Sequence, residues 1–310
     1  MELAETVRTV VDDVASLVGS GKVADYIPAL ARVPLERFGI AVRTVGGECL
    51  VAGDADERFS IQSVSKVLTL TLALETRADG LWRRVGKEPS GDPFNSLFQL
   101  EFERGLPRNP LINAGAIVVA DCLVSDRHDA KGDIRDFATR LSGSSIDFDA
   151  VVAASERDTG FRNAALAHLM KSFGNLENPV EMVLDTYFHQ CSLSMSCREL
   201  ATAFGYLADG GLQAALSDAG SGADARIVSP ERARRINALL LTCGTYDRAG
   251  EFAFEVGLPA KSGVGGGIVA VVPGRGTIAV WSPGLGPSGN SIAGVEALRR
   301  FVARTGWSVF

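Results

Sequence analysis

The spacing of apolar residues changes along the chain between a helical and a strand-like period. Over residues 3–18 they recur at helical spacing, which predicts an amphipathic helix that ends near Gly19. Residues 38–44 and 49–52 alternate like strands, and the glycines between them predict a hairpin turn. The leucines and threonines of residues 67–74 then predict a helix that enters the core.

The middle of the chain keeps a helical period for a long distance. Residues 85–96 come first, and their many turn-forming residues predict an ordered loop. Patterns with Gly, Ser or Asn-Pro near an end follow, and they predict helices at residues 134–141, 148–157, 164–173, 180–190, 197–207 and 230–242. We therefore expect an all-helical block between the two ends of the chain.

The last part of the chain returns to strands. Residues 268–272 and 277–281 are predicted strands joined by a turn, and residues 291–304 are a predicted helix. With no low-complexity linker or repeat, the simplest topology is one α+β domain over residues 1–310, in which both chain ends supply one antiparallel sheet. The α/β part would comprise residues 1–62 and 247–310, and the inserted helical part residues 63–246. A cleft would lie at their junction.

Composition and charge exclude several classes of function. With 310 residues, of which 46% are apolar and 22% charged, the chain can bury a substantial core. A formal net charge of −6 without a basic cluster argues against nucleic acid as a partner. The N-terminus lacks the pattern of a secretory signal, and no apolar run is long enough to span a bilayer. We therefore expect a cytoplasmic protein without a membrane partner.

Cysteine and histidine usage narrows the chemistry further. The five cysteines are scattered, without a Cys-x-x-Cys pair, and are expected to be reduced and packed as small apolar groups. The three histidines, His128, His168 and His189, show no metal-ligand spacing and no triad pattern. We expect no metal and no cofactor. If the protein is a hydrolase, lysine and tyrosine must carry the protons.

The candidate nucleophile is Ser63, which stands between a strand-like segment and the helix predicted over residues 67–74. A serine that opens a helix can cap it with its side chain, and its own backbone N–H has no acceptor within the helix. Lys66 lies three residues on, and residues at that spacing share one helix face. Ser-x-x-Lys is the nucleophile motif of serine β-lactamases and penicillin-binding proteins. A capping serine beside a solvated lysine would leave the same pattern.

Two further stretches could complete such a site. Lys261-Ser262-Gly263 opens a glycine-rich run and is similar to the Lys-Thr-Gly element that accompanies Ser-x-x-Lys in β-lactamase-like enzymes. The glycines permit close backbone approach to a ligand, although a strand edge or bulge would look the same. Asn113 enters an apolar helix of small residues, where a buried amide must be either a structural bridge or a ligand contact.

Together these motifs resemble the serine-dependent glutaminase family, from about Tyr26 to Asn290. The resemblance rests on a series of ordered matches: Asp25-Tyr26-Ile27-Pro28, Gln62-Ser63-Val64-Ser65-Lys66, Glu88-Pro89-Ser90-Gly91, Phe94-Asn95-Ser96, Asn109-Pro110, Asn113-Ala114-Gly115-Ala116, Ser155-Glu156, Arg162-Asn163, Asp185 with Tyr187-Phe188, Cys243-Gly244-Thr245-Tyr246-Asp247 and Leu258-Pro259-Ala260-Lys261-Ser262-Gly263-Val264. Residues 130–149 and the tail after residue 290 match least.

This resemblance implies a β-lactamase-like fold and hydrolysis of L-glutamine to L-glutamate and ammonia. It implies catalytic roles for Ser63 as nucleophile and Lys66 as base, with Tyr26 and Tyr246 beside them. The substrate-binding residues that it implies are Ser63, Asn113, Glu156, Asn163, Tyr187, Tyr246 and Val264. The backbone amides of Ser63 and Val264 would form the oxyanion hole. The resemblance also implies a homodimer or homotetramer.

The implied base must meet a physical demand. At a reference pKa of about 10.4, only about one lysine in a few thousand is neutral at pH 7, so the pKa of Lys66 must fall by roughly 3 units. Burial, with Lys261 as a second cation nearby, could lower it. Glu156 can supply the anion for a substrate ammonium, and Gly160 is expected to break the helix so that Glu156 and Asn163 flank one loop. A solvated carboxylate at a helix end is the alternative for Glu156.

Two other functions fit parts of this pattern. A penicillin-recognising acylase would use the same fold, but no Ser-Asp-Asn element lies between Lys66 and Lys261, and the N-terminus shows no signal peptide. A ligand sensor with a relic site would retain the pocket without turnover. An apolar pocket separates glutamine from asparagine by only about 1–3 kcal/mol per methylene, so a preference for glutamine follows from the resemblance and not from the residues.

Overall fold

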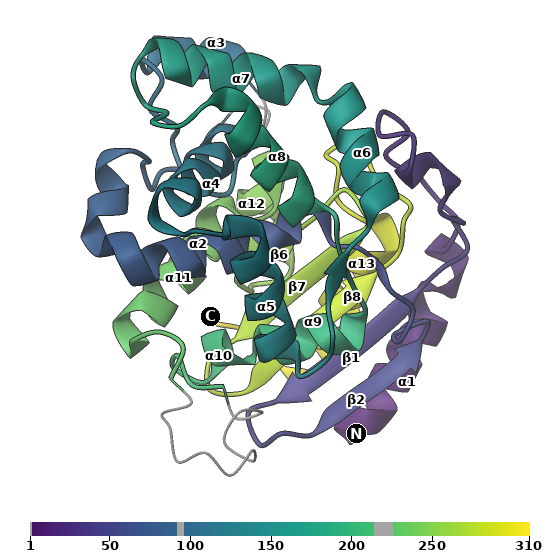
Figure 1. Cartoon of the computed structure of the whole chain (residues 1–310). Helices are drawn as coiled ribbons and strands as arrows, with labels where there is room; N and C mark the ends of the chain where they lie inside the picture. Colours follow the sequence, from purple (N-terminus) through teal and green to yellow (C-terminus); the bar gives the residue numbers. More distant parts are fainter. Residues whose placement is uncertain (1, 92–95, 214–225) are drawn as a thin grey trace.

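One antiparallel sheet joins the two ends of the chain, as Figure 1 shows for the computed structural model. The structure describes residues 2–91, 96–213 and 226–310. The strand order is β2-β1-β8-β7-β6, so strands from the start and the end of the chain pair directly. The strands are β1 (Gly39–Thr44), β2 (Cys49–Gly53), β6 (Ala260–Ser262), β7 (Gly267–Val272) and β8 (Gly276–Trp281). The predicted sheet and α+β class are confirmed.

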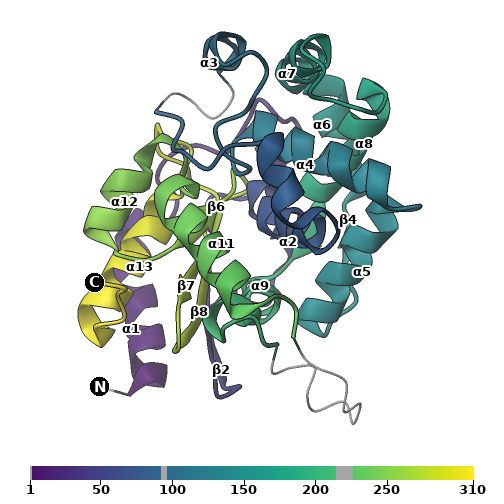
Figure 2. The ribbon, with the colours of Figure 1, turned by 90° about the vertical axis from the view of Figure 1, so that its left-hand side faces the viewer.

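Helices cover both faces of this sheet (Figure 2). Along β1, Ile40 and Val42 pack with the terminal helices α1 (Leu3–Val14) and α13 (Ile292–Thr305), while Ala41 belongs to the core on the opposite face. Burial on both faces explains why every residue of β7 and β8 is buried. The sheet therefore supports the segments that pack at its β6 edge.

The remaining helices form the larger part of the molecule. Helix α2 (Ser65–Arg77) is its centre, because every residue from Ser65 to Leu74 is buried. The other helices of this part are α3 (Leu97–Phe102), α4 (Asn113–Asp126), α5 (Ala130–Ser142), α6 (Ala150–Thr159), α7 (Phe161–Ser172), α8 (Val180–Cys191), α9 (Cys197–Ala203), α10 (Gly205–Ala208) and α11 (Pro230–Cys243). Helix α12 (Ala249–Glu255) instead packs with α1 and α13 on the sheet. Within the described residues, no helix is long and apolar enough to cross a membrane.

The expectation of an all-helical middle is wrong. A second sheet of order β3-β5-β4 pairs β3 (Phe59–Ser60), β5 (Leu193–Met195) and β4 (Asp147–Phe148). Strands of two or three residues are too short to give a period in the sequence, so the helical spacing around them dominated the prediction. The helix predicted from residue 148 in fact begins at Ala150, where the Asp149 side chain accepts hydrogen bonds from two backbone amides.

The position of Ser63 also differs from the prediction. It lies in a short 3-10 turn, Gln62–Val64, and the α-helix begins two residues later without a side-chain cap. Ser65 Oγ donates to Gln62 O and closes this turn. The predicted loop at residues 85–96 is described only outside residues 92–95, which lie beyond the described part of the chain.

A buried ion pair in the helical part should be costly to break. Asp121 is fully buried and accepts hydrogen bonds from Arg84 and from the backbone amides of Glu177 and Asn178. Asp121→Ala leaves these donors unpaired, so we expect unfolding free energy to fall by about 3–5 kcal/mol. Chemical denaturation followed by circular dichroism measures the loss.

Asp13→Ala is the matched control, because it removes a partly exposed Asp–Arg pair with Arg304. Its expected cost is about 1 kcal/mol or less. Equal losses of unfolding free energy in the two variants would contradict the larger cost expected for the buried pair.

Candidate active site

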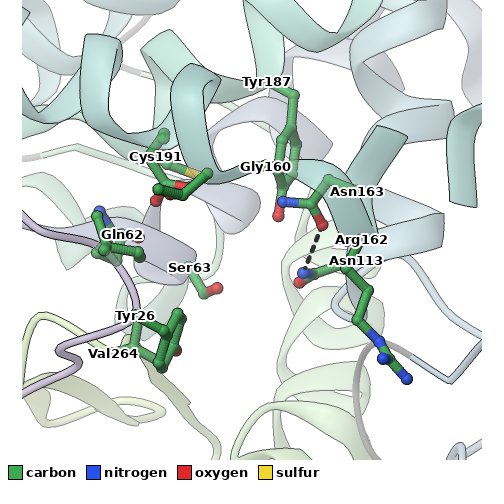
Figure 3. A pocket seen from close by; sticks show the side chains of 13 residues that line it. Tyr26, Gln62, Ser63, Asn113, Gly160, Arg162, Asn163, Tyr187, Cys191 and Val264 are labelled. Carbon is green, nitrogen blue, oxygen red and sulfur yellow. Dashed lines mark hydrogen bonds between the residues drawn. The ribbon is translucent and has the colours of Figure 1, made fainter. Parts of the chain in front are cut away.

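A cavity of about 180 Å³ lies where the 3-10 turn of Ser63 meets the β6 edge of the large sheet and the helices α6, α7 and α8. Figure 3 shows side chains converging on it from segments far apart in the sequence. The cavity is lined by Tyr26, Ile27, Gln62, Ser63, Asn113, Glu156, Thr159, Gly160, Arg162, Asn163, Tyr187, Cys191 and Val264. The fold thus brings together seven residues singled out in the sequence.

Lys66 lies one turn beyond Ser63 and points into the protein. Its side chain is 1% exposed, and Nζ donates to Asn113 Oδ1 at 2.6 Å and to Leu111 O at 3.4 Å. Burial lowers the pKa of Lys66 to about 8, although the nearby Glu156 favours the charged form. A substantial fraction of Lys66 is therefore neutral near pH 7 to 8, and the alternative of a solvated lysine is wrong.

Asn113 links the base to the opposite wall of the cavity. It is the first residue of α4, and besides accepting from Lys66 it donates Nδ2 to Asn163 Oδ1 at 2.9 Å. The sequence left open whether Asn113 is a structural bridge or a ligand contact. Both alternatives have support, since it bridges two elements and also lines the cavity. Its amide oxygen faces a cation and its amide nitrogen faces a carbonyl oxygen, so its orientation is fixed.

Glu156 is a buried carboxylate. It is 6% exposed, which excludes the solvated helix end that the sequence left open. Burial raises the pKa of Glu156 to about 7, while a hydrogen bond from Gln62 and the charge of Lys66 act in the opposite direction. Near neutral pH this carboxyl therefore titrates inside the cavity.

Helices α6 and α7 meet at Gly160, close to Glu156. A Cβ at Gly160 would lie 2.5 Å from a ring carbon of Phe188, so a larger residue does not fit. No loop separates Glu156 from Asn163, contrary to expectation, because α7 begins immediately after Gly160. The carboxyl end of one helix and the amino end of the next thus lie beside the same cavity.

Tyr246 stands behind Ser63 on the sheet side. Its side chain is 8% exposed, and its phenol lies beside the hydroxyl groups of Ser63 and Ser262. Burial raises the pKa of Tyr246 well above that of a free tyrosine, so the phenol stays protonated at neutral pH. Its backbone has a φ of 61°, an unfavourable region for a large residue. Such local strain is typical of functional positions.

Lys261 is a second buried amine. It is fully buried, with Nζ 4.6 Å from the centre of the Tyr246 ring and hydrogen bonds to Gly244 O at 2.9 Å and Ser262 O at 2.6 Å. Burial, and then the charge of Lys66, hold the pKa of Lys261 well below its usual range. Burial lowers the pKa of Lys66, as expected, whereas the expected contribution of Lys261 is not among the causes of that shift.

Glycines let the β6 edge lie directly against the turn of Ser63. A Cβ at Gly263 would come within 2.5 Å of Ile61 O, and one at Gly265 within 2.2 Å of Ser60 O. These glycines therefore serve close packing between two backbones, one of the alternatives left open by the sequence. The contact brings Val264 to the cavity beside Ser63 (Figure 3).

The two remaining predicted residues differ in exposure. Tyr187 is 2% exposed, with its ring 5.9 Å from Lys66 Nζ, whereas Tyr26 is 58% exposed at the mouth of the cavity. Sequence reasoning assigned no role to Gln62, although it directly precedes Ser63, or to Cys191, although it lies one helical turn after Tyr187. Among the described residues, no three His, Cys, Asp or Glu side chains form a possible metal site.

Known proteins resemble this chain over its whole length. The family model "Glutaminase" matches residues 21–310. A glutaminase of Aliivibrio salmonicida is 56% identical over 99% of this chain and 98% of its own. One of Rhodopseudomonas palustris is 57% identical over the same shares.

Solved structures agree with the sequence relatives. A Bacillus glutaminase is 30% identical, with a TM-score of 0.89 over all of both chains. The protein Mglu, solved in its glutamate form, is 35% identical, with a TM-score of 0.90 over 99% of this chain and 69% of its own. The predicted β-lactamase-like fold is confirmed. The chain belongs to the glutaminase family and is an amidohydrolase that acts on L-glutamine.

Proposed function

We propose that the chain hydrolyses L-glutamine to L-glutamate and ammonia through a γ-glutamyl ester of Ser63. The observation that carries this mechanism is the buried amine of Lys66, one helical turn from Ser63 and hydrogen-bonded at the wall of the cavity. A serine becomes a nucleophile when a neighbouring base takes its proton. Lys66 is the base that this geometry supplies.

The environment of Lys66 suits this task. At a pKa of about 8, about one Lys66 in ten is neutral at pH 7, far more than at the reference value of about 10.4. A neutral amine has two N–H groups, and it can donate them to Asn113 Oδ1 and Leu111 O. Its lone pair is then left for the proton of the Ser63 hydroxyl.

The proposed reaction has two balanced steps. Ser63 Oγ attacks the carbonyl carbon of the glutamine side-chain amide, the C–N bond breaks, and ammonia leaves with the proton that came from the serine. Tyr246, whose phenol lies beside Ser63, is placed to relay this proton. Water then cleaves the ester and returns the proton to Ser63. The backbone amides of Ser63 and Val264 would stabilise the oxyanion of each tetrahedral intermediate.

The end of the cavity formed by Glu156 and Asn163 suits the head group of an amino acid, which is its ammonium and carboxylate. Glu156, at the carboxyl end of α6, would bind the substrate ammonium, and Asn163, in the first turn of α7, would bind its carboxylate. Helix ends favour these same signs of charge, cations at a carboxyl end and anions at an amino end. Tyr187 would close the cavity against Lys66. The relative Mglu, solved in its glutamate form, supports a site for this head group.

Assembly and location extend the proposal. We propose a homodimer or homotetramer that works in the cytoplasm. The five cysteines form no disulfide, which is typical of a reducing compartment. Light scattering on the purified chain tests the assembly, and a monomer at micromolar concentration would contradict it.

Replacing the nucleophile should abolish turnover. For Ser63→Ala we expect kcat for ammonia release to fall by at least about 10⁴-fold, because no acyl-enzyme forms. A coupled ammonia assay on glutamine and asparagine measures turnover, and mass spectrometry of quenched enzyme tests for the adduct on Ser63.

Ser65→Ala is the matched control for Ser63→Ala, since it removes a buried hydroxyl two residues away that bonds only the turn. It should keep activity within about tenfold, because a single lost hydrogen bond is worth about 1 kcal/mol. Unchanged turnover in Ser63→Ala would refute the acyl-enzyme mechanism. Stable labelling by a fluorescent penicillin would favour the acylase alternative.

Activity should rise with pH in two steps. Glu156 is protonated below its pKa of about 7 and cannot bind an ammonium there, and Lys66 is a poor base below its pKa of about 8. Both groups therefore make kcat/KM increase from pH 6 to 9. Initial rates at graded glutamine concentrations and pH values measure the profile.

Glu156→Gln should remove the lower step and raise KM by about 100-fold, as expected for a buried charge contact, while kcat changes much less. Asp158→Asn, an exposed carboxyl on the same helix, is the control and should change neither. A larger effect of Glu156→Gln on kcat than on KM would refute a substrate-binding role.

A further inference from the structure

A small hollow lies beside the 3-10 turn Tyr246–Arg248, outside the catalytic cavity. Its volume is about 310 Å³, and it shares no lining residue with the cavity that holds Ser63. Helices α12 and α13, on one side of the large sheet, contribute to it (Figure 2). It is lined by Arg248, Glu251, Phe252, Glu255, Gly286, Ser288, Asn290, Ser291, Ile292 and Val295. The reaction proposed above uses none of these residues.

Asn290 brings a buried, unpaired acceptor to this hollow. The residue is 7% exposed, and its Nδ2 donates to Thr245 O at 3.2 Å and to Ser288 Oγ at 3.3 Å. Its Oδ1 is buried and has no hydrogen-bond partner within the described part of the chain. Exchanging the two amide atoms would set Oδ1 against Thr245 O, so the orientation is fixed. A ligand that donates a hydrogen bond to Oδ1 would satisfy it.

The charged residues of the hollow favour a cation. Arg248 and Glu251 form a salt bridge with each other, so their charges compensate. Glu255 lies one helical turn after Glu251 and forms no salt bridge among the residues that the structure describes. Arg299 interacts with Glu255 electrostatically but is paired with Glu296. A carboxylate and an amide oxygen both accept hydrogen bonds, which suits an ammonium group.

An apolar wall completes the hollow. Phe252 is 5% exposed, and Ile292 and Val295 are partly buried beside it. A pocket that combines apolar side chains with a few polar groups is typical of a small-molecule site. We propose that this hollow binds a primary ammonium ion with a short alkyl group, and that the bound cation raises turnover.

The hollow is connected to Tyr246 through Asn290. The Nδ2 of Asn290 holds the carbonyl of Thr245, the residue before Tyr246. Gly289 lies against the Tyr246 ring, since a Cβ there would be 3.7 Å from Cε2. A charged donor at Oδ1 polarises the amide and strengthens its bond to Thr245 O, because hydrogen bonds in a chain reinforce one another. The effect on turnover rests on the proton relay proposed for Tyr246, whereas binding does not.

The experiment uses propylammonium chloride as the probe. At pH 7 the amine is almost entirely protonated, because alkylamines have a pKa near the lysine value of about 10.4. Ligand-observed NMR titration in saturating glutamate measures binding outside the catalytic cavity. Initial rates of glutamate formation at graded glutamine concentrations give kcat and KM. Tetramethylammonium chloride, a cation without N–H, and potassium chloride are the matched controls.

We expect propylammonium to bind with a dissociation constant on the order of 1 mM, since so small a ligand makes few contacts. It should raise kcat by about twofold, because one hydrogen bond is strengthened and none is created. Neither control salt should raise kcat.

Three results would overturn parts of this inference. Absence of binding would mean that water alone satisfies Asn290, and would overturn the site. An equal rise in kcat with potassium chloride would be an effect of ionic strength. Binding without a rise in kcat, or a rise in KM alone from competition at Glu156, would overturn the effect on turnover.

Two variants locate the site. Glu255→Gln keeps the shape and should weaken binding by about threefold or more, as for a partly exposed charge contact, without changing basal activity. Glu48→Gln, an exposed carboxyl in the turn between β1 and β2, is the control and should change neither.

Asn290→Ala removes both the acceptor and the bond to Thr245 O. It should abolish the response to propylammonium and lower basal kcat several-fold, while KM stays within about twofold, because Asn290 positions Tyr246 and does not touch the substrate. Undiminished binding in Glu255→Gln or an undiminished response in Asn290→Ala would contradict the assignment. If Asn290→Ala does not fold, the comparison of Glu255→Gln with Glu48→Gln decides.

Discussion

The chemistry proposed for the cavity depends on the burial of the Lys66 amine away from water. An ammonium ion moved into a protein interior loses several kcal/mol of hydration, and the group responds by releasing its proton more readily. Helix α2 imposes this burial because its residues from Ser65 to Leu74 are all buried. The carbonyl groups of Leu111 and Asn113 hold the amine without neutralising it. A close carboxylate partner would instead keep Lys66 protonated, which would defeat its proposed use as a base.

Burial also explains the shifted pKa values of Lys261 and Glu156. Lys261 is buried against backbone carbonyls and the Tyr246 ring, and the charge of Lys66 makes its own protonation less favourable. Glu156 is the buried acid of the cavity, and its raised pKa shows that Lys66 does not compensate fully for its burial. A substrate ammonium at Glu156 would supply what this carboxyl lacks. A zwitterionic ligand with its ammonium at Glu156 would thus compensate the cost of burying this carboxylate.

Much of this arrangement could be predicted from local patterns. The strands beside the turns at residues 45–48 and 273–275 were predicted from alternation in the first hairpin and from apolar β-type runs in the second, and both hairpins pair as expected. The Ser63 to Lys66 spacing needs only one helical turn, so sequence alone places those two residues together.

The features that sequence reasoning missed depend on tertiary contacts. The strands of β3, β4 and β5 are too short to carry a period and exist only because they pair with one another. The junction at Gly160 is set by the ring of Phe188, which comes from another helix. Gln62 contacts Glu156 across the cavity, and no spacing in the sequence links residues so far apart. The roles assigned to the site residues remain predictions, since geometry brings them together without testing what each does.

The two ends of the catalytic cavity differ in a way that bears on specificity. At the head-group end, Glu156 and Asn113 are less than a tenth exposed, so an ill-fitting ligand would leave buried polar groups unpaired at a cost of a few kcal/mol. At the mouth of the cavity, in contrast, Tyr26 is exposed. If the proposed function holds, such a site would discriminate more strongly at its buried end than at its open mouth, because only the buried end penalises a mismatch. The asymmetry follows from where the cavity meets solvent, and it would hold for any acyl chemistry at Ser63.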